Sequence, residues 1–261
     1  MELPPGFTAH VGNIGIRDDT TDFAVIACSG VATAAARFTR SRFAGPSVEV
    51  SRRALADERL RAVVVVSKNA NVATGAAGLA DAEELAQRVG DLVEGEPTDV
   101  LVTSTGVIGR PYPMDRVRRY LDDLTSHAGR AERFPVTDAG AVAEAMMTTD
   151  TFPKLTSVDV AVAGGTVRVS GVCKGAAMIA PNMATMLAVI LTDIKIEPNR
   201  LRECLVEANS RTFNCLTIDG DTSTNDTVIV MAGGGSEARE LGGGSADQDA
   251  FSSLLNEACM S

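Results

Sequence analysis

The sequence is poor in the residues on which much side-chain catalysis depends. Its 261 residues include no tryptophan, two tyrosines and two histidines, His10 and His127. A Ser-His-Asp or Cys-His catalytic system would have to use one of these two histidines, and neither lies beside a nucleophile motif. A catalytic histidine is therefore not expected, and any nucleophile would need another base.

Cysteine is also scarce and irregularly spaced. The five cysteines have no CxxC spacing, and they are Cys28, Cys173, Cys204, Cys215 and Cys259. An odd count without paired spacing argues against both a zinc site and a disulfide framework, and it suits a reducing compartment. We expect no metal and interpret the cysteines as small core residues.

An excess of positive charge is missing as well. The formal net charge is −10 and the pI is near 4.8, so long-range repulsion disfavours nucleic acid and anionic membrane surfaces as partners. No apolar run reaches the roughly 20 residues needed to cross a bilayer, and the first residues lack the pattern of a signal peptide. These features predict a cytoplasmic protein that acts on small molecules.

The residues that are present predict a layered α/β protein with strands packed under helices. Hydrophobic residues make up 45% of the chain, which is long enough to bury a substantial core. Short valine-rich runs predict strands at 22–28, 61–67, 99–104, 157–163, 166–172, 184–196 and 226–231. A turn at Gly164-Gly165 is expected to join two of them. Helical periodicity predicts helices at 81–93, 115–124, 139–147, 200–214 and 247–260.

The most informative stretch is residues 174–193, KGAAMIAPNMATMLAVILTD. A loop containing glycine and proline leads Ala184 and Thr185 to the mouth of a predicted buried strand. If the bond between them were broken, Thr185 would carry a hydroxyl and a free α-amine, whose pKa of about 7.7 to 8.0 lets it act as a base without histidine. The alternative is a threonine that only opens a strand and bonds the backbone.

Six motifs in order resemble those of the ornithine acetyltransferase family, which includes glutamate N-acetyltransferases and bifunctional arginine-biosynthesis proteins. They are FTRSRFAGP (38–46), NANVATG (69–75), STGVIGRPYPM (104–114), MTTDTFPK (147–154), KGAAMIAPNMATML (174–187) and DGDTSTNDT (219–227). The resemblance implies a sandwich of β-sheets flanked by helices, of the N-terminal-nucleophile type. It also implies self-cleavage into residues 1–184, the α segment, and residues 185–261, the start of a β segment.

The resemblance assigns roles to five positions. Thr185 would be the nucleophile, released by cleavage of the Ala184–Thr185 bond. Thr105 and Gly106 would stabilise the oxyanion, a role that suits a hydroxyl and an N–H placed after a strand. Thr148 and Lys174 would bind substrate together with Thr185. Without the resemblance, Thr105-Gly106 reads as a strand-ending turn and Lys174 as a surface charge.

The implied activity is transfer of an acetyl group from N-acetylornithine to glutamate through an acetyl-threonine, in arginine biosynthesis or a related secondary-metabolite pathway. No cofactor is expected, with acetyl-CoA as an alternative donor. The two segments should stay packed together in a heterotetramer or higher oligomer. Family chains continue past the position of Ser261, so further site residues are expected beyond it. The alternatives are an amide hydrolase of the same nucleophile type and an inactive truncated paralogue that acts as a partner protein.

Two further groups of residues have a structural interpretation. The stretch 219–227 is not spaced like an EF-hand, which needs a glutamate at its twelfth position, and we expect it to be a polar turn near the cleft. Met178, Met183 and Met186 are expected to fill the core.

Overall fold

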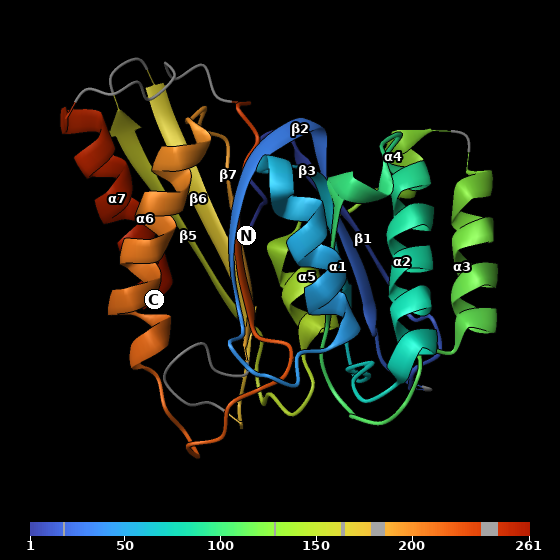
Figure 1. The fold of residues 1–261 in the computed structure, drawn as a ribbon. Helices are drawn as coiled ribbons and strands as arrows, with labels where there is room; N and C mark the ends of the chain where they lie inside the picture. The colour runs from blue at the N-terminus through green and yellow to red at the C-terminus, as the bar shows by residue number, and fades with distance from the viewer. Residues whose placement is uncertain (18, 128, 163–164, 179–185, 236–244) are drawn as a thin grey trace.

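A computed structural model of the chain describes residues 1–17, 19–127, 129–162, 165–178, 186–235 and 245–261, the side chains of 162 and 245–248 excepted (Figure 1). Its strands are β1 Phe7–Gly12, β2 Phe23–Phe38, β3 Arg59–Val66, β4 Val100–Ser104, β5 Lys154–Val162, β6 Gly165–Lys174, β7 Leu187–Thr192 and β8 Thr227–Ala232. Its helices are α1 Pro46–Ala54, α2 Gly75–Leu92, α3 Met114–Ser126, α4 Arg130–Arg133, α5 Ala139–Met146, α6 Pro198–Arg211 and α7 Ser245–Met260.

The strands form one hydrogen-bonded mixed sheet in the order β4-β3-β2-β8-β7-β6-β5, with β1 also paired to β2. The β3–β4 and β7–β8 pairs are parallel and the others are antiparallel. Strand β2 is the centre of this arrangement, because its first part pairs with β3 and its last part with β8.

Strand β2 turns over in its middle, where Figure 1 draws it bending at the top of the molecule. The register against β3 shifts between Ala27 and Ala32, and Ser29 and Gly30 are exposed there. A register break of this kind increases local twist and redirects a strand. The bend divides the sheet into two halves that face each other, one with β1, β3 and β4 and the other with β5 to β8.

Helices cover the outer face of each half, so the fold is a layered sandwich. One outer cluster packs α2 and α3 on β3 and β4, and another packs α6 and α7 on β6, β7 and β8. The core between the halves takes side chains from both, together with α5. In β7, Ala188 and Ile190 face the helices while Leu187, Val189 and Leu191 face the other half. Strands buried on both faces read as continuous apolar runs, and the predicted fold class is confirmed.

Several predicted boundaries are wrong. Strand β7 ends at Thr192, short of the predicted 196, and α2 begins at Gly75 rather than 81. Gly165 belongs to β6 and pairs with Val162, so it is not a turn residue; residues 163–164 lie outside the described part. The sequence does not predict strand β1, which is short and half-polar, or helix α1, in which Val48-Glu49-Val50 alternates as in a strand.

The structure shows where the few histidines and cysteines of the sequence lie. His10 lies in β1, and its Nε2 is 2.7 Å from the Tyr120 hydroxyl. All five cysteines are free, and Cys215 is exposed, which corrects its assignment to the core. Among the described residues, no cluster of three or more His, Cys, Asp or Glu could hold a metal. In the same part of the chain, no helix has the length and apolar character to cross a membrane.

The end of the sandwich opposite the β2 bend gathers the polar loops. The last residue of β3 pairs with Ser104 at the end of β4, and Lys174 at the end of β6 pairs with Leu187 at the start of β7. The Asn225 side-chain amide joins the two halves there, donating to the Ser104 carbonyl at 2.9 Å. Segments that are far apart in sequence therefore meet at this end.

Candidate active site

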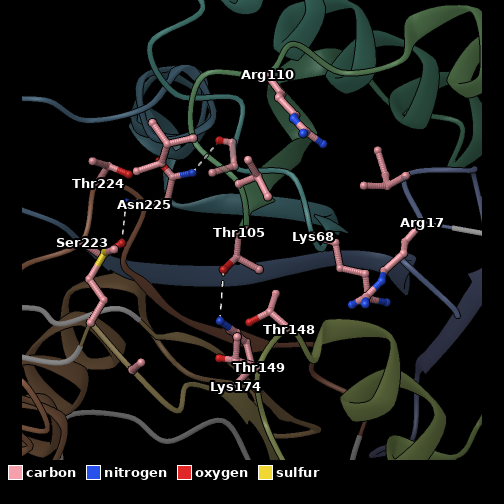
Figure 2. Close-up of a pocket in the computed structure, with 17 residues that line it drawn as sticks. Arg17, Lys68, Thr105, Arg110, Thr148, Thr149, Lys174, Ser223, Thr224 and Asn225 are labelled. Carbon is pink, nitrogen blue, oxygen red and sulfur yellow. Dashed lines mark hydrogen bonds between the residues drawn. The ribbon is translucent and has the colours of Figure 1, made fainter.

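A cavity of about 500 Å³ lies at this end of the sandwich and is called the site cavity below. Its lining comes from the loops that precede β2 and β8 and from those that follow β3, β4, α5 and β6. Figure 2 shows it with the lining residues Ile16, Arg17, Lys68, Ala70, Thr105, Gly106, Val107, Ile108, Arg110, Thr148, Thr149, Lys174, Ala177, Met178, Ser223, Thr224 and Asn225. The four predicted site residues that the structure describes, Thr105, Gly106, Thr148 and Lys174, all line it.

Lys174 and Thr105 form the inner wall of the site cavity. Lys174 is 4% exposed, and its ammonium donates to the Thr105 hydroxyl oxygen at 3.1 Å (Figure 2). Burial lowers the pKa of Lys174, while the nearby Asp150 carboxylate raises it. Because Thr105 accepts this bond with its oxygen, its own hydroxyl hydrogen remains able to donate to another group. Lys174 is therefore not the surface charge that its sequence context suggests.

Gly106 occupies a conformation that requires glycine. Its φ is +132°, and a Cβ built on it would lie 2.2 Å from the Lys68 carbonyl carbon. The Thr105 amide donates to the Val66 carbonyl at 3.0 Å, whereas the Gly106 amide has no hydrogen-bond partner among the residues that the structure describes. The loop thus presents a hydroxyl and a backbone N–H at the same wall.

Asp150 lies near Lys174 and holds the neighbouring backbone in place. Its fully buried side chain accepts hydrogen bonds from the Lys154 ammonium at 2.7 Å, the Gly175 amide at 2.7 Å and the Thr148 amide at 3.1 Å. Burial alone would raise the pKa of Asp150, but these bonds outweigh it and lower the pKa. The ionised carboxylate holds the chain on both sides of the cavity, at Thr148 and just after Lys174.

Asp226 lies just before β8 and is 1% exposed. Its Oδ1 accepts the Met186 amide at 3.0 Å, and its Oδ2 has no partner among the described residues. Burial raises the pKa of Asp226 to about 8, against the opposing effects of its hydrogen bonds and of Lys174. This carboxyl anchors the chain where β7 begins.

The predicted nucleophile Thr185 and its neighbour Ala184 lie outside the described residues. The residue that follows them, Met186, is buried, and its carbonyl accepts the Thr227 amide at 3.1 Å. Its neighbour Leu187 is the ladder partner of Lys174. The role of Thr185 therefore stays a prediction, next to a backbone that the structure fixes.

Sequence reasoning missed several cavity residues. Arg17, Lys68 and Arg110 line the site cavity, and none of them had been singled out. Met178 also lines it and is 37% exposed with φ +59°, so its assignment to the core is wrong. Only the placement of Lys68 directly after a valine-rich strand could have drawn attention to it.

The structure also tests the predictions for the 219–227 stretch and for the methionines. Residues 223–225 line the site cavity, so the polar turn near the cleft is confirmed. Met186 is buried as expected, and Met183 lies outside the described residues. A second cavity of about 660 Å³, between β5, β6, β7 and the ends of α6 and α7, contains none of the described site residues.

The architecture defines the class of protein first. An aminopeptidase from Ochrobactrum anthropi, described as a variant of the Ntn hydrolase fold, matches the whole of this chain with a TM-score of 0.52 at 14% identity. At that identity the likeness shows the fold alone. The chain shares the layered fold of that protein.

The sequence comparisons then identify the family. The sequence model of the ArgJ family matches residues 8–261, and the chain belongs to this family. It is 42% identical to arginine biosynthesis bifunctional protein ArgJ 2 from a Nostoc species over 88% of this chain and 57% of that protein. It is 43% identical to glutamate N-acetyltransferase Oat2 from Streptomyces clavuligerus over 89% of this chain and 57% of that protein. The chain thus spans little more than half the length of these relatives.

Solved structures agree with the family assignment. The ArgJ protein from Bacillus halodurans matches with a TM-score of 0.62 at 32% identity, over 70% of this chain and 95% of that chain. Ornithine acetyltransferase from Mycobacterium tuberculosis, solved with ornithine, matches with a TM-score of 0.56 at 30% identity, over 69% of this chain and 95% of that chain.

Proposed function

We propose that this protein transfers an acetyl group from N-acetylornithine to glutamate, with Thr185 as the nucleophile. The observation that carries the proposal is the hydrogen bond from buried Lys174 to the Thr105 hydroxyl at the wall of the site cavity. It orients Thr105 as a donor, beside a Gly106 amide without a partner in the described part of the chain. Two converging donors of this kind stabilise a developing oxyanion by roughly 3 kcal/mol each.

Maturation comes first in this proposal. Hydrolysis of the Ala184–Thr185 bond by water leaves residues 1–184 and a second segment that starts at Thr185, and the two stay packed as one folded unit. Thr185 then has a free α-amine, which can take the proton of its own hydroxyl. The carboxyl of Asp226, bonded to the Met186 amide, holds the new terminus by its second residue.

In the first half-reaction, the Thr185 hydroxyl oxygen attacks the acetyl carbonyl of N-acetylornithine and its proton passes to the α-amine. The oxyanion is bound by the Thr105 hydroxyl and the Gly106 amide. The C–N bond then breaks, the departing amine takes the proton, and ornithine leaves an acetyl ester on Thr185.

In the second half-reaction, the amine of glutamate attacks the acetyl ester. The same two donors bind the oxyanion, the C–O bond to Thr185 breaks, and the threonine oxygen regains a proton from the attacking amine. Lys174 and Thr148 orient the amino-acid substrates in both halves. Acetyl-CoA is an alternative donor in this scheme, no cofactor is required, and the two segments assemble into a heterotetramer or higher oligomer serving arginine biosynthesis or a related pathway.

Mass spectrometry of the purified protein tests the proposal. We expect two pieces that meet at Ala184/Thr185, a single 27.2 kDa chain after Thr185→Ala, and an acetyl adduct on the Thr185 piece after incubation with N-acetylornithine. Acetyl transfer to glutamate should exceed release of free acetate. Faster acetate release would identify a hydrolase instead, and an uncut, unlabelled chain would identify an inactive partner protein.

A further inference from the structure

Among the described residues that line the site cavity, every charged side chain is cationic, although the whole chain carries a net charge of −10. Lys174 lies deep in the cavity, and Arg17, Lys68 and Arg110 are the others; no acidic residue is among the described residues that line it. Arg17 and Arg110 are exposed and Lys68 is half-buried. The cavity therefore carries positive charge both at its inner wall and at its mouth.

Arg17 and Lys68 are held together around one buried carboxylate, that of Asp22. The Asp22 carboxylate accepts the Ile14 amide at 2.7 Å, the Ile16 amide at 2.7 Å and the Arg17 amide at 3.2 Å. The Lys68 ammonium donates to the Thr21 carbonyl next to Asp22. These bonds fix the backbone of Arg17 and the head of Lys68 beside each other, as Figure 2 shows.

The two cations are close enough to oppose each other. Burial lowers the pKa of Lys68, Asp22 raises it, and the charge of Arg17 lowers it again. Two like charges held side by side are stabilised when an anion binds between them. Arg110 reaches the same cavity from the loop after β4 (Figure 2), which adds a third positive charge at the mouth.

Lys68 also has a backbone conformation that lysine rarely adopts. Its φ is +71°, in the left-handed region that favours glycine and that costs other residues of the order of 1 kcal/mol or more. Such strain concentrates at ligand-binding sites. A lysine at this position therefore adds charge to the cavity at the expense of local stability.

We propose that Arg17, Lys68 and Arg110 form an outer anion subsite that binds the side-chain carboxylate of a dicarboxylic amino acid. Lys174 binds the other end of the same ligand, deeper in the cavity. This proposal rests on the proposed function and names the residues that would select glutamate as acceptor. A cavity of about 500 Å³ is large enough to hold an N-acyl amino acid, whose side-chain carboxylate would lie at the mouth.

Calorimetric titration of the full chain tests the subsite without requiring turnover. The probes are N-acetylglutamate and N-acetylglutamine, which differ only in the side-chain carboxylate. We expect N-acetylglutamate to bind at least tenfold more tightly, since a charge-assisted hydrogen bond contributes about that much. Arg17→Gln and Lys68→Gly should each weaken N-acetylglutamate about tenfold and leave N-acetylglutamine unchanged.

The variants carry their own controls. Lys68→Gly suits φ +71°, so its thermal midpoint should equal or exceed that of the wild type, which separates lost binding from lost folding. Arg59→Gln removes an exposed charge at the opposite end of β3 and should change neither affinity.

Three results would overturn the subsite. They are equal affinity for the two probes, no binding of N-acetylglutamate, and variants that weaken acetyl-CoA but not N-acetylglutamate. The outcome is independent of the mass-spectrometric test above. An uncut chain that still distinguishes the probes would refute the proposed function and leave the subsite standing, and the opposite pattern would do the reverse.

Discussion

The chain positions its cationic side chains in two different ways. On the outer face, Arg88 and Arg118 of α2 and α3 share the Glu84 carboxylate, with N–O distances of 2.8 and 2.7 Å, and Arg88 also reaches Asp122 at 2.8 Å. These bonds, that from Arg118 first, lower the pKa of Glu84 to about 2. Each of these two arginines has an acidic partner within its own layer.

The cations of the site cavity are arranged differently. No carboxylate is among the described residues that line the cavity; Asp150 and Asp226 lie near Lys174, and Asp22 lies near Lys68, behind the lining. Lys174 bonds a hydroxyl and Lys68 a carbonyl. The outer pairs neutralise themselves and join helices, whereas the cavity leaves positive charge for a ligand. Substitutions at the two places should therefore differ in what they change.

The largest effect is expected for Gly106→Ala, which disturbs the loop packed on the Lys68 backbone. The new Cβ would meet the Lys68 carbonyl carbon at 2.2 Å, so the loop that carries the Gly106 amide must move. Acetyl transfer should fall more than about 100-fold, and the free energy of unfolding by roughly 1 to 3 kcal/mol. Enzyme kinetics and urea titration measure the two. Near-normal transfer would remove Gly106 from the oxyanion site.

Lys174→Met should come next and should separate activity from stability. Losing the charge and the bond to Thr105 is expected to lower kcat/KM for acetyl transfer about 100-fold. Replacing a buried charge with an apolar side chain of similar length should keep the free energy of unfolding within about 1 kcal/mol. A fall in stability with unchanged kinetics would make Lys174 a structural cation like Arg88.

Asp226→Asn should change the pH dependence of stability. The pKa of Asp226 is about 8 in the folded protein and 3.8 in its ordinary state, so between these values only the folded chain keeps the proton. The contribution of this group is fully present below pH 3.8 and is lost as the pH rises towards about 8. Urea midpoints should therefore fall from pH 5 to pH 8 in the wild type and fall less in the variant. Identical slopes would show that Asp226 does not titrate in this range.

The smallest effect is expected for Glu84→Gln on the helical face. Its lowered pKa gives stability above the ordinary value of 4.5, and this stability is lost as the pH falls towards about 2. Because the pair is near the surface, the variant should lose no more than about 1 kcal/mol at pH 7, with the difference closing in acid. Affinity for N-acetylglutamate should not change. A loss of affinity would break the distinction between the two sets of cations.

Much of the fold could be predicted because β3 and β4 are short, apolar and buried on both faces. The bend of β2 could not, since a register break depends on contacts with β3 and β8 that local sequence does not reveal. Lys174 and Thr105 were found through resemblance alone. Arg17 and Lys68 were missed because a positive φ and shared contacts around Asp22 are properties of the folded chain, and each residue alone reads as an ordinary surface charge.

The β6–β7 and β2–β8 ladders have a consequence for how the protein would refold after cleavage. Both ladders join residues before 184 to residues after 185, so the proposed cut would open the chain inside an intact sheet. The native state would then be a stoichiometric complex of two peptides that had folded as one. Denatured mature protein would have to reassemble by a second-order encounter, slower on dilution, whereas the Thr185→Ala chain would refold at a rate independent of concentration. Maturation would thus exchange a unimolecular folding reaction for a bimolecular one that the cell never needs to repeat.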